Sequence, residues 1–599
     1  MDKKEFKDSI LRVLKLDLIQ ELAFSSIGCG FFILLYNFFP NRYWDQIYRT
    51  TIILILTLSF FFVFVVFNQT DSNKKIFKVN YKRNIILFSI FNFAGYLFLF
   101  YNAQWGYNGL AADNVYRTAY ITRMAHSGYP QDYGYKGFSA FYAPFYWYCL
   151  ALISILFHIP PYKMIRVGLL ITAYIMPILL FEIWKKIYPI KTSFVISILS
   201  TFFLVSIYSI DHTMGAFLII PYFMYYFENC SNKKFTKKDY IIGGIFGSIV
   251  FSTFFFYFLI IPIYYLISLI QKGREFRNNL KHIIYTTLTL IIFSSWFWAP
   301  LLKDIILIGF ESHQNRYFHE GSLAYPILYY VGFGINPVGL AYIIRKYRIS
   351  PDIKILGNLI LSINLAFILG FIGILIGFPI SHDRLMKLSG YILIIASSIF
   401  YVRFFEFVAK NDLLRRNNLN INLYQFEIYF LITVMIVQCN SHWTFITRTP
   451  GYDAANSGNS MAEVRDIVEE LDYEDKIFLT NEWRVIMFLP IYLFLLPNPY
   501  YSHPSALYNE RVKFLVELSE CNSSKKFHDM IIDNEFGPID YFYLDLENNG
   551  TELVFDVPVE TYPEGREYYE IVFKIHLFQD DDLFKEIKID GVLIYRTKY

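Results

Sequence analysis

Apolar runs long enough to cross a lipid bilayer recur along the first 440 residues of the chain. A transmembrane helix needs about 20 mostly apolar residues. Only 18% of the residues are charged and the mean hydropathy is +0.35, whereas soluble domains carry about 25% charged residues. The sequence therefore predicts an α-helical polytopic membrane protein. Thirteen spans are predicted, at 18–39, 48–67, 84–101, 164–184, 192–210, 213–227, 240–253, 254–270, 283–302, 325–344, 355–377, 388–404 and 424–440.

The net charge of +3 conceals two parts of opposite charge. Residues 441–599 hold 14 Lys and Arg against 29 Asp and Glu, and residues 1–440 hold 40 against 22. We therefore predict a transmembrane domain, 1–440, and a soluble domain, 441–599. With the N-terminus in the cytoplasm, 28 of the 40 positive charges fall in cytoplasmic segments, as the positive-inside rule expects. The protein is then a multi-pass protein of the cell (inner) membrane, and the loop 102–163 and the soluble domain are extracytoplasmic.

Two segments are too short for an ordinary crossing. The run 145–159 has 15 residues between Pro144 and Pro160, or about 22 Å of helix against a hydrocarbon core of about 30 Å. We predict that it lies at the outer interface. Residues 240–270 have basic loops at both ends, so two short helices that turn near Ser252 are predicted there.

Charged residues gather near the start of the loop 102–163, at Asp113, Arg117, Arg123 and His126. Asp113 precedes a helix-compatible run, and Arg117 shares its face at a spacing of four. One interpretation is a general base, Asp113, beside a guanidinium that binds phosphate. The other is a helix cap with an ordinary ion pair.

The residues that follow carry a resemblance to a known family. An acidic residue and an Arg at helical spacing, a Gly-x-x-x-Asp-Tyr step and an aromatic, proline-marked entry into a second helix resemble the first external loop of GT-C class membrane glycosyltransferases. The similarity is greatest to the arabinofuranosyltransferases that decorate cell-wall galactan. The matching residues are Asp113, Arg117, Gly128, Asp132, Tyr142 and Pro144, with Ala143 in place of a first proline.

A second stretch, residues 477–515, resembles the external C-terminal part of the same group. Its pattern is a strand, an apolar helix, an aromatic-Ser-His-Pro step and a helix that bears Arg511. The apolar piece 485–496 is too short to span a membrane and contains Pro490, so we expect it to pack in a core or on the membrane face.

The resemblance implies a donor sugar on a polyprenyl phosphate and inversion at the sugar carbon. Asp113 is then the general base, and Asp132 is an alternative base or acceptor ligand. A bonded Arg117 would make Asp113 a weaker base, so Arg117 is assigned to the donor phosphate. The other candidates for this phosphate are Arg123, His382 and Arg384, the last two of which equally suit a helix cap with interface anchors.

Further polar residues are candidate substrate ligands, each with a simpler alternative. Asp211 and His212 lie in a short outer turn and are otherwise ordinary turn residues. The loop 303–324 is otherwise a solvated loop. Besides Asp211 and His212, the candidates are His126, Tyr142, His313, Arg316 and His319.

The soluble domain alternates predicted strands and helices, which indicates an α/β or α+β fold. It binds the acceptor glycan in one interpretation and is a lid or scaffold in the other. The predicted helices are 461–475 and 506–520, and the predicted strands are 477–480, 539–546, 551–557, 570–578 and 592–597.

The predicted function is transfer of a sugar, arabinofuranose by the resemblance, from a polyprenyl phosphate to a cell-envelope glycan or glycolipid at the extracytoplasmic face. The alternatives are a transporter or flippase, and a non-catalytic assembly protein. One or two cationic side chains suffice for a monophosphate leaving group, so no metal cofactor is expected, and a divalent cation stays open. The expected partners are the lipid donor, the acceptor and the bilayer, and no nucleic acid.

Overall fold

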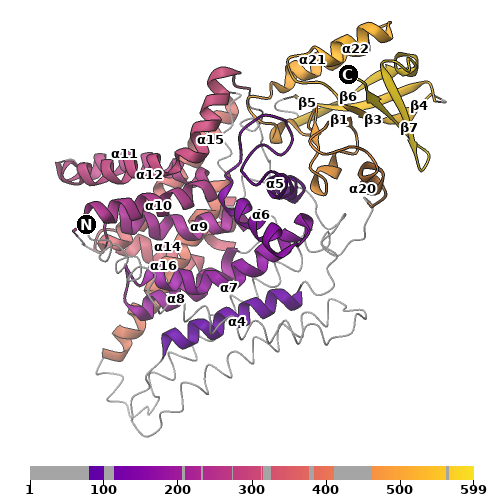
Figure 1. Cartoon of the computed structure of the whole chain (residues 1–599). Helices are drawn as coiled ribbons and strands as arrows, with labels where there is room; N and C mark the ends of the chain where they lie inside the picture. The colour runs from indigo at the N-terminus through magenta and orange to yellow at the C-terminus, as the bar shows by residue number, and fades with distance from the viewer. Residues whose placement is uncertain are drawn as a thin grey trace, which may run out of the picture.

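A helical body carries a smaller domain with two β-sheets at one end of the molecule (Figure 1). The computed structural model describes residues 80–99, 113–204, 210–230, 234–272, 274–311, 313, 325–332, 334–376, 383–410, 462–548, 550–561 and 565–599. The predicted spans 18–39, 48–67 and 424–440 lie outside these residues.

The helical body is built mostly from apolar helices. They are α4 (Tyr81–Leu99), α5 (Asp113–Ser127), α6 (Phe145–Phe157), α7 (Met164–Trp184), α8 (Ile190–Leu204), α9 (Ile210–Tyr222), α10 (Lys237–Thr253), α11 (Ile260–Lys272), α12 (Arg274–Leu307), α13 (Tyr325–Ile327), α14 (Asn336–Lys346), α15 (Pro351–Leu375) and α16 (Asp383–Lys410). Four helices of the described chain are long and apolar enough to cross a membrane, or six if each of two bent pairs counts as one span. The predicted total of thirteen is not confirmed.

Burial separates a central helix from a peripheral one. The apolar window of α16 is 89% buried, whereas that of α12 is 17% buried. Side chains such as Ile284, Leu288 and Ile292 leave an apolar stripe of α12 exposed at helical spacing. Such a surface is unfavourable in water and suits lipid. The protein is a multi-pass membrane protein.

Close backbone contact packs α14 against α16. A Cβ atom at Gly339 would lie 2.1 Å from the carbonyl oxygen of Leu393. Only glycine permits this approach, and small residues at helix contacts are typical of membrane bundles.

Two predicted features of the body are present, and a third predicted segment has a break that was not predicted. A short helix, α6, follows Pro144, and α10 meets the next helical segment at a bend of 115° after Thr253. The predicted span 325–344 is instead broken into two pieces bent by 85°. Gly334 has a positive φ of 39° and Pro337 stands in the first turn of α14, so the chain turns and starts a new helix there.

The C-terminal domain is an α+β domain with two sheets. Its helices are α20 (Ala462–Glu469), α21 (Tyr508–Ser519) and α22 (Ser524–Ile532), and its strands are β1 (Ile477–Thr480), β2 (Tyr492–Leu493), β3 (Tyr541–Tyr543), β4 (Asp545–Glu547), β5 (Glu552–Thr561), β6 (Gly565–Lys574), β7 (Phe584–Ile589) and β8 (Val592–Thr597). One sheet has the order β2-β1-β3-β8-β7, with β1 parallel to β2 and to β3, and the other has the order β4-β5-β6.

Several details of this domain differ from the prediction. The strand predicted at 570–578 ends at Lys574 and gives way to a 3-10 turn, and β7 and α22 were not predicted. The predicted apolar helix at 485–496 is wrong, because it is a 3-10 turn (Trp483–Met487) followed by β2. Pro490 cannot continue a helix. The segment is buried, in agreement with a core position.

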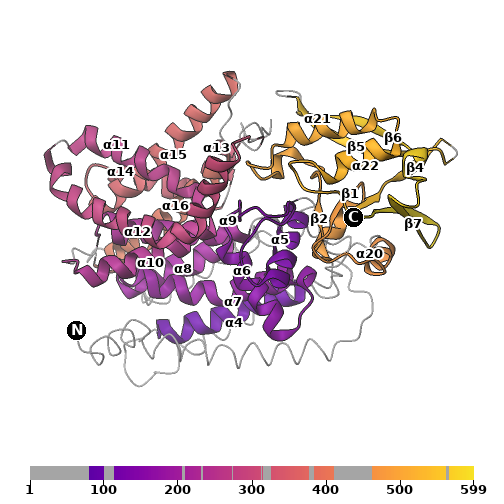
Figure 2. The same cartoon turned by 45° about the horizontal axis from the view of Figure 1, so that its top comes forward.

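Helix α5 lies where the body meets the C-terminal domain, and both views show it there (Figures 1 and 2). The turn after α5 depends on Gly128, whose φ is +76° and whose amide donates to Met124 O at 2.9 Å. Glycine favours this left-handed conformation at a helix C-terminus. The chain then turns toward α6 beside the C-terminal domain.

Candidate active site

Asp113 is the first residue of α5, and its carboxylate is partly exposed to solvent. The positive end of a helix favours a carboxylate there. Arg117, one turn further on, places Nη2 3.5 Å from Asp113 Oδ2. The Asp113 side chain is 39% exposed and that of Arg117 is 11% exposed. The two residues therefore form the predicted pair on one helix face.

Arg117 also joins this pair to a distant part of the chain. Its Nη2 lies 3.5 Å from Oδ1 of Asp211, in the first turn of α9. Its guanidinium is 5.7 Å from the centre of the Trp147 ring of α6. His212 follows beside Asp211, with its ring 4.0 Å from that of Phe254. The fold thus brings together three helices around one guanidinium, including the predicted pair Asp211 and His212.

Tyr501 brings the C-terminal domain into the site. Its hydroxyl donates a hydrogen bond to Asp113 Oδ1. Its ring stacks on Tyr116 at 3.8 Å, and Tyr116 stacks on Trp483 at 5.3 Å. Tyr501, Tyr116 and Trp483 were not predicted from the sequence to be site residues. The only signal was the aromatic residue before Ser-His-Pro, which nothing in the sequence connects with Asp113.

Positive charge surrounds the Asp113 carboxylate. Burial acts to raise the pKa of Asp113, but Arg117, the Tyr501 hydrogen bond, Arg384 and Lys387 together hold this pKa below its usual value. Arg384 makes no hydrogen bond or ion pair with the residues that the structure describes. Asp113 is thus ionised at neutral pH, and a cation is available close to it.

Tyr142 borders the same site. Its backbone oxygen accepts a hydrogen bond from the Tyr120 hydroxyl at 3.0 Å, and its ring lies 6.3 Å from that of Tyr501. Burial raises the pKa of the Tyr142 hydroxyl, while Arg384 and Arg117 act to lower it. The Tyr142 hydroxyl therefore stays neutral, and it lies close enough to Arg384 and Arg117 to feel their charges.

Arg123 and His126 lie on another side of α5 and contact the C-terminal domain. Arg123 Nη1 donates to Asp475 Oδ1 at 2.7 Å and Nη2 donates to Ile491 O at 2.5 Å. The guanidinium covers the Tyr492 ring at 3.6 Å. His126 Nε2 is 3.5 Å from Asp475 Oδ2. The predicted donor-phosphate role of Arg123 is not supported, because a buried domain contact already occupies this guanidinium.

Asp132 is buried and organises the loop after α5. Its Oδ1 accepts hydrogen bonds from the amides of Gly134 at 2.9 Å and Tyr135 at 2.7 Å. Burial raises the pKa of Asp132 to about 7, against the opposing effect of these hydrogen bonds and of Arg123 and Arg511. The geometry is that of a turn that holds the loop, and the role of Asp132 as a base or acceptor ligand stays a prediction.

His313 lies apart from this cluster, against the C-terminal domain. Its Nε2 is 3.6 Å from Glu311 Oε1 and its Nδ1 is 3.6 Å from Glu560 Oε2. Arg316, His319 and His382 lie outside the described residues. Within the described ranges, no three or more His, Cys, Asp or Glu side chains are arranged to hold a metal ion.

The comparison with protein families decides the identity. The family model described as "Arabinofuranosyltransferase N terminal" matches residues 48–403. The chain belongs to this family. The match contains Asp113, Arg117, Asp211 and Arg384, and it ends before the C-terminal domain. The resemblance to arabinofuranosyltransferases predicted from the loop is confirmed, and the chain is a member of a glycosyltransferase family.

Solved structures and curated proteins were compared as well. ArnT from Cupriavidus metallidurans bound to undecaprenyl phosphate is 10% identical, with a TM-score of 0.48 over 84% of this chain and 97% of ArnT. The apo form of ArnT is 11% identical, with a TM-score of 0.47 over 83% of this chain and 95% of ArnT. The comparison with curated proteins finds no match.

Proposed function

We propose that this arabinofuranosyltransferase-family protein transfers a sugar from a polyprenyl phosphate to a cell-envelope glycan or glycolipid. Arabinofuranose, the sugar in the family's description, is the proposed donor sugar. The observation that carries the proposal is the Asp113 carboxylate, which is ionised, partly exposed and held between Tyr501 and Arg117. A carboxylate in this state is able to accept the proton of an attacking hydroxyl.

The charges around Asp113 suit a phosphate on the donor. Two carboxylates, Asp113 and Asp211, lie with three cations, Arg117, Arg384 and Lys387. The group therefore has an excess of positive charge. Guanidinium groups offer paired N–H donors to phosphate oxygens, and Arg384 has no competing partner in the described chain. We assign Arg117 and Arg384 to the donor phosphate.

Donor binding also resolves the low basicity of Asp113. Arg117 helps to hold the pKa of Asp113 below its usual value. When Arg117 turns to the negatively charged phosphodiester of the donor, the positive charge near Asp113 falls, so the pKa of Asp113 rises. The carboxylate then becomes a better base when the donor is present.

The proposed reaction is a direct displacement. The acceptor oxygen forms a bond to the anomeric carbon while its proton passes to an Asp113 oxygen. The bond from the anomeric carbon to the phosphate oxygen breaks, and the phosphate leaves with the electron pair. Because attack and departure occur on opposite faces, the configuration inverts. Arg117 and Arg384 stabilise the negative charge that develops on the phosphate.

The membrane side follows from the charge pattern of the loops. The sequence puts the loop of Asp113 and the C-terminal domain on the extracytoplasmic side. A polyprenyl tail dissolves in the bilayer, so its phosphate reaches a surface site such as α5. The soluble acceptor approaches the same site from the water.

Replacing Asp113 tests this proposal. We expect Asp113→Asn to lower transfer by at least a factor of about 10³, in the range of general-base effects. The assay uses the full chain in lipid nanodiscs with a polyprenyl-phosphate arabinofuranose donor and a short galactan acceptor. Asp556→Asn, at an exposed carboxylate of β5, is the matched control and retains activity. Transfer by a folded Asp113→Asn variant at more than a tenth of the original rate would contradict the proposal.

We further propose that the reaction needs no metal cofactor. The cations beside Asp113 supply the charge that a metal ion would otherwise provide. Incubation with excess EDTA, followed by gel filtration and assay, is expected to change the rate by less than twofold. A loss that added Mg²⁺ or Mn²⁺ restores would show that a divalent cation is required.

A further inference from the structure

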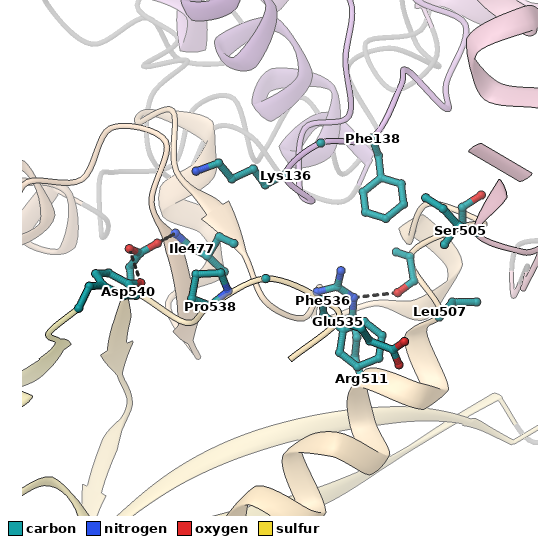
Figure 3. A pocket seen from close by; sticks show the side chains of 15 residues that line it. Lys136, Phe138, Ile477, Ser505, Leu507, Arg511, Glu535, Phe536, Pro538 and Asp540 are labelled. Atoms are coloured by element: carbon teal, nitrogen blue, oxygen red, sulfur yellow. Dashed lines mark hydrogen bonds between the residues drawn. The ribbon is translucent and has the colours of Figure 1, made fainter. Parts of the chain in front are cut away.

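A cavity of about 610 Å³ lies between the loop after α5 and the C-terminal domain. Figure 3 shows Lys136 and Phe138 on one side, with Arg511, Phe536 and Pro538 of the C-terminal domain on the other. Small-molecule sites usually measure roughly 300–1,000 Å³. The cavity is distinct from the Asp113 cluster, none of whose residues lines it.

The lining offers aromatic rings to a ligand. Phe138, Phe536 and Tyr599 contribute rings from three separate segments of the chain. The Tyr599 side chain is largely exposed, and Phe138 and Phe536 are partly buried. Aromatic side chains in a solvent-accessible site bind ligands that have both apolar faces and polar edges.

Most charges of the lining are already satisfied. Asp540 accepts hydrogen bonds from the Ile477 amide and the Tyr599 hydroxyl, both at 2.8 Å. Arg511 donates to the carbonyl oxygens of Ala506 at 2.7 Å and Phe494 at 3.0 Å. The two cations of the lining, Lys136 and Arg511, are matched in number by two carboxylates, Glu535 and Asp540, so the cavity has no excess of positive charge for a phosphate.

Two polar groups of the lining make no hydrogen bond with the described residues, although the charge of Glu535 acts on Arg511. The Glu535 carboxylate is exposed at the cavity and makes no hydrogen bond or ion pair there. The Ser505 hydroxyl is fully buried and has no hydrogen-bond partner. A carboxylate accepts hydrogen bonds from ligand hydroxyls, and a hydroxyl donates or accepts. This combination fits a neutral, polyhydroxylated ligand.

Rings connect the cavity with the proposed active site. Phe138 lies 4.9 Å from His503, and Phe141 lies 5.8 Å from His503. Phe141 is then 4.9 Å from Tyr142, which borders the Asp113 site. The segments 133–142 and 501–511 therefore carry residues of both places, which are separated by a few packed side chains.

We infer that this cavity is a carbohydrate subsite that binds a neutral sugar residue of the acceptor, remote from the hydroxyl that is glycosylated. The inference rests on the proposed function, because it extends the acceptor path from Asp113. The Glu535 carboxylate then accepts hydrogen bonds from sugar hydroxyls, and the rings of Phe138 and Phe536 stack on the faces of the sugar.

The test compares long and short acceptors with variants of the cavity. The probes are a galactan oligosaccharide long enough to contact both places and a disaccharide acceptor that reaches only the Asp113 site. We expect Glu535→Ala to raise the KM for the long acceptor about tenfold, as the loss of a charge-assisted hydrogen bond predicts. The KM for the lipid donor stays within twofold. Phe536→Ala, which removes a ring, is expected to have the same selective effect.

A matched control and a binding measurement separate the outcomes. Glu517→Ala, at an exposed glutamate of α21 outside the cavity, leaves both KM values unchanged. Isothermal titration of the long acceptor into donor-free protein in nanodiscs is expected to lose its signal in Glu535→Ala. If Asp113→Asn is inactive but both cavity variants keep the original KM and binding, the subsite is disproved and the proposed function stands. If Asp113→Asn remains active, the proposed function itself fails.

Discussion

The two ends of α5 carry the same residue type in two different states. Near the N-terminus, Arg117 is 3.5 Å from Asp113 and from Asp211, and the Asp113 side chain is 39% exposed. Toward the C-terminus, Arg123 is 2.7 Å from Asp475, is 1% exposed and stacks on Tyr492. The first arginine lies beside a partly exposed carboxylate, where we propose that the donor phosphate binds. The second joins the helix to the C-terminal domain.

Two arginines on one helix can therefore have different roles, because each faces a different surface. Arg117 points toward a charged cluster shared by α5, α9 and α16. Arg123 faces Asp475, a backbone carbonyl and the Tyr492 ring of the C-terminal domain, and both terminal nitrogens of its guanidinium donate hydrogen bonds there. The two arginines of this helix therefore have different surroundings, and we expect different effects when each is replaced.

Of the changes to the two arginines, the removal of Arg117 is expected to have the larger effect, a loss of transfer. We expect Arg117→Ala to lower kcat/KM for the lipid donor by roughly 10²–10³, because a preorganised cation at the leaving phosphate is lost. Arg117→Lys keeps a charge without the planar fork and is expected to recover part of the rate. Steady-state kinetics in nanodiscs with varied donor concentration measure this. A loss of less than tenfold would remove Arg117 from the donor site.

Replacement of Arg123 is expected to affect stability before chemistry. Arg123→Ala removes a buried charge contact, a hydrogen bond to a backbone carbonyl and the stacking on Tyr492, at a cost on the order of 3 kcal/mol. Thermal unfolding in detergent measures the change. His126→Ala is the control, because its contact with the same half-exposed Asp475 is worth less than about 1 kcal/mol. Equal stabilities of the two variants would contradict a structural role for Arg123.

A smaller effect is expected in the pH dependence of stability. The pKa of Asp132 is about 7 in the folded protein, against an ordinary value of 3.8. The folded state therefore holds a proton that the unfolded state has released, so this group's contribution is complete below pH 4 and falls as the pH rises toward 7. Between pH 5 and 7 the fall is about 2 kcal/mol.

Asp132→Asn tests this dependence, because an amide oxygen still accepts from the amides of Gly134 and Tyr135. We expect the difference in unfolding free energy between the original protein and the variant to change by about 2 kcal/mol from pH 5 to pH 7, in favour of the variant at pH 7. A constant difference across this range would show that Asp132 is already ionised at pH 5.

The local part of the site was predictable from sequence. Asp113 and Arg117 are four residues apart on a helix, so their pairing needs only the helical repeat. The short helix after Pro144 and the bend near Ser252 likewise follow from length and from proline and charge patterns. The contact of Arg117 with Asp211 was not predictable, because nothing in the sequence states which helices pack together.

The C-terminal contribution to the site was beyond sequence reasoning for the same reason. Tyr501 is 388 positions from Asp113, and its hydrogen bond exists only because the C-terminal domain docks on α5. The separation of Arg117 from Arg123 into two roles also depends on that docking. Strand β2 is only two residues long. Because so short a strand has no clear sequence pattern, its pairing with neighbouring strands places it in the sheet.

The sequence by itself determined that this is a helical membrane protein with an acidic soluble domain, and that an aspartate and an arginine share one helix face. Hydrophobic length, charge balance and helical periodicity are local properties, so they can be read along the chain. The tertiary structure decided that Asp211, Arg384 and Tyr501 surround this aspartate, and that Arg123 serves as a domain contact. Those assignments depend on packing between segments far apart in the chain, where burial and partner geometry set the state of each charge.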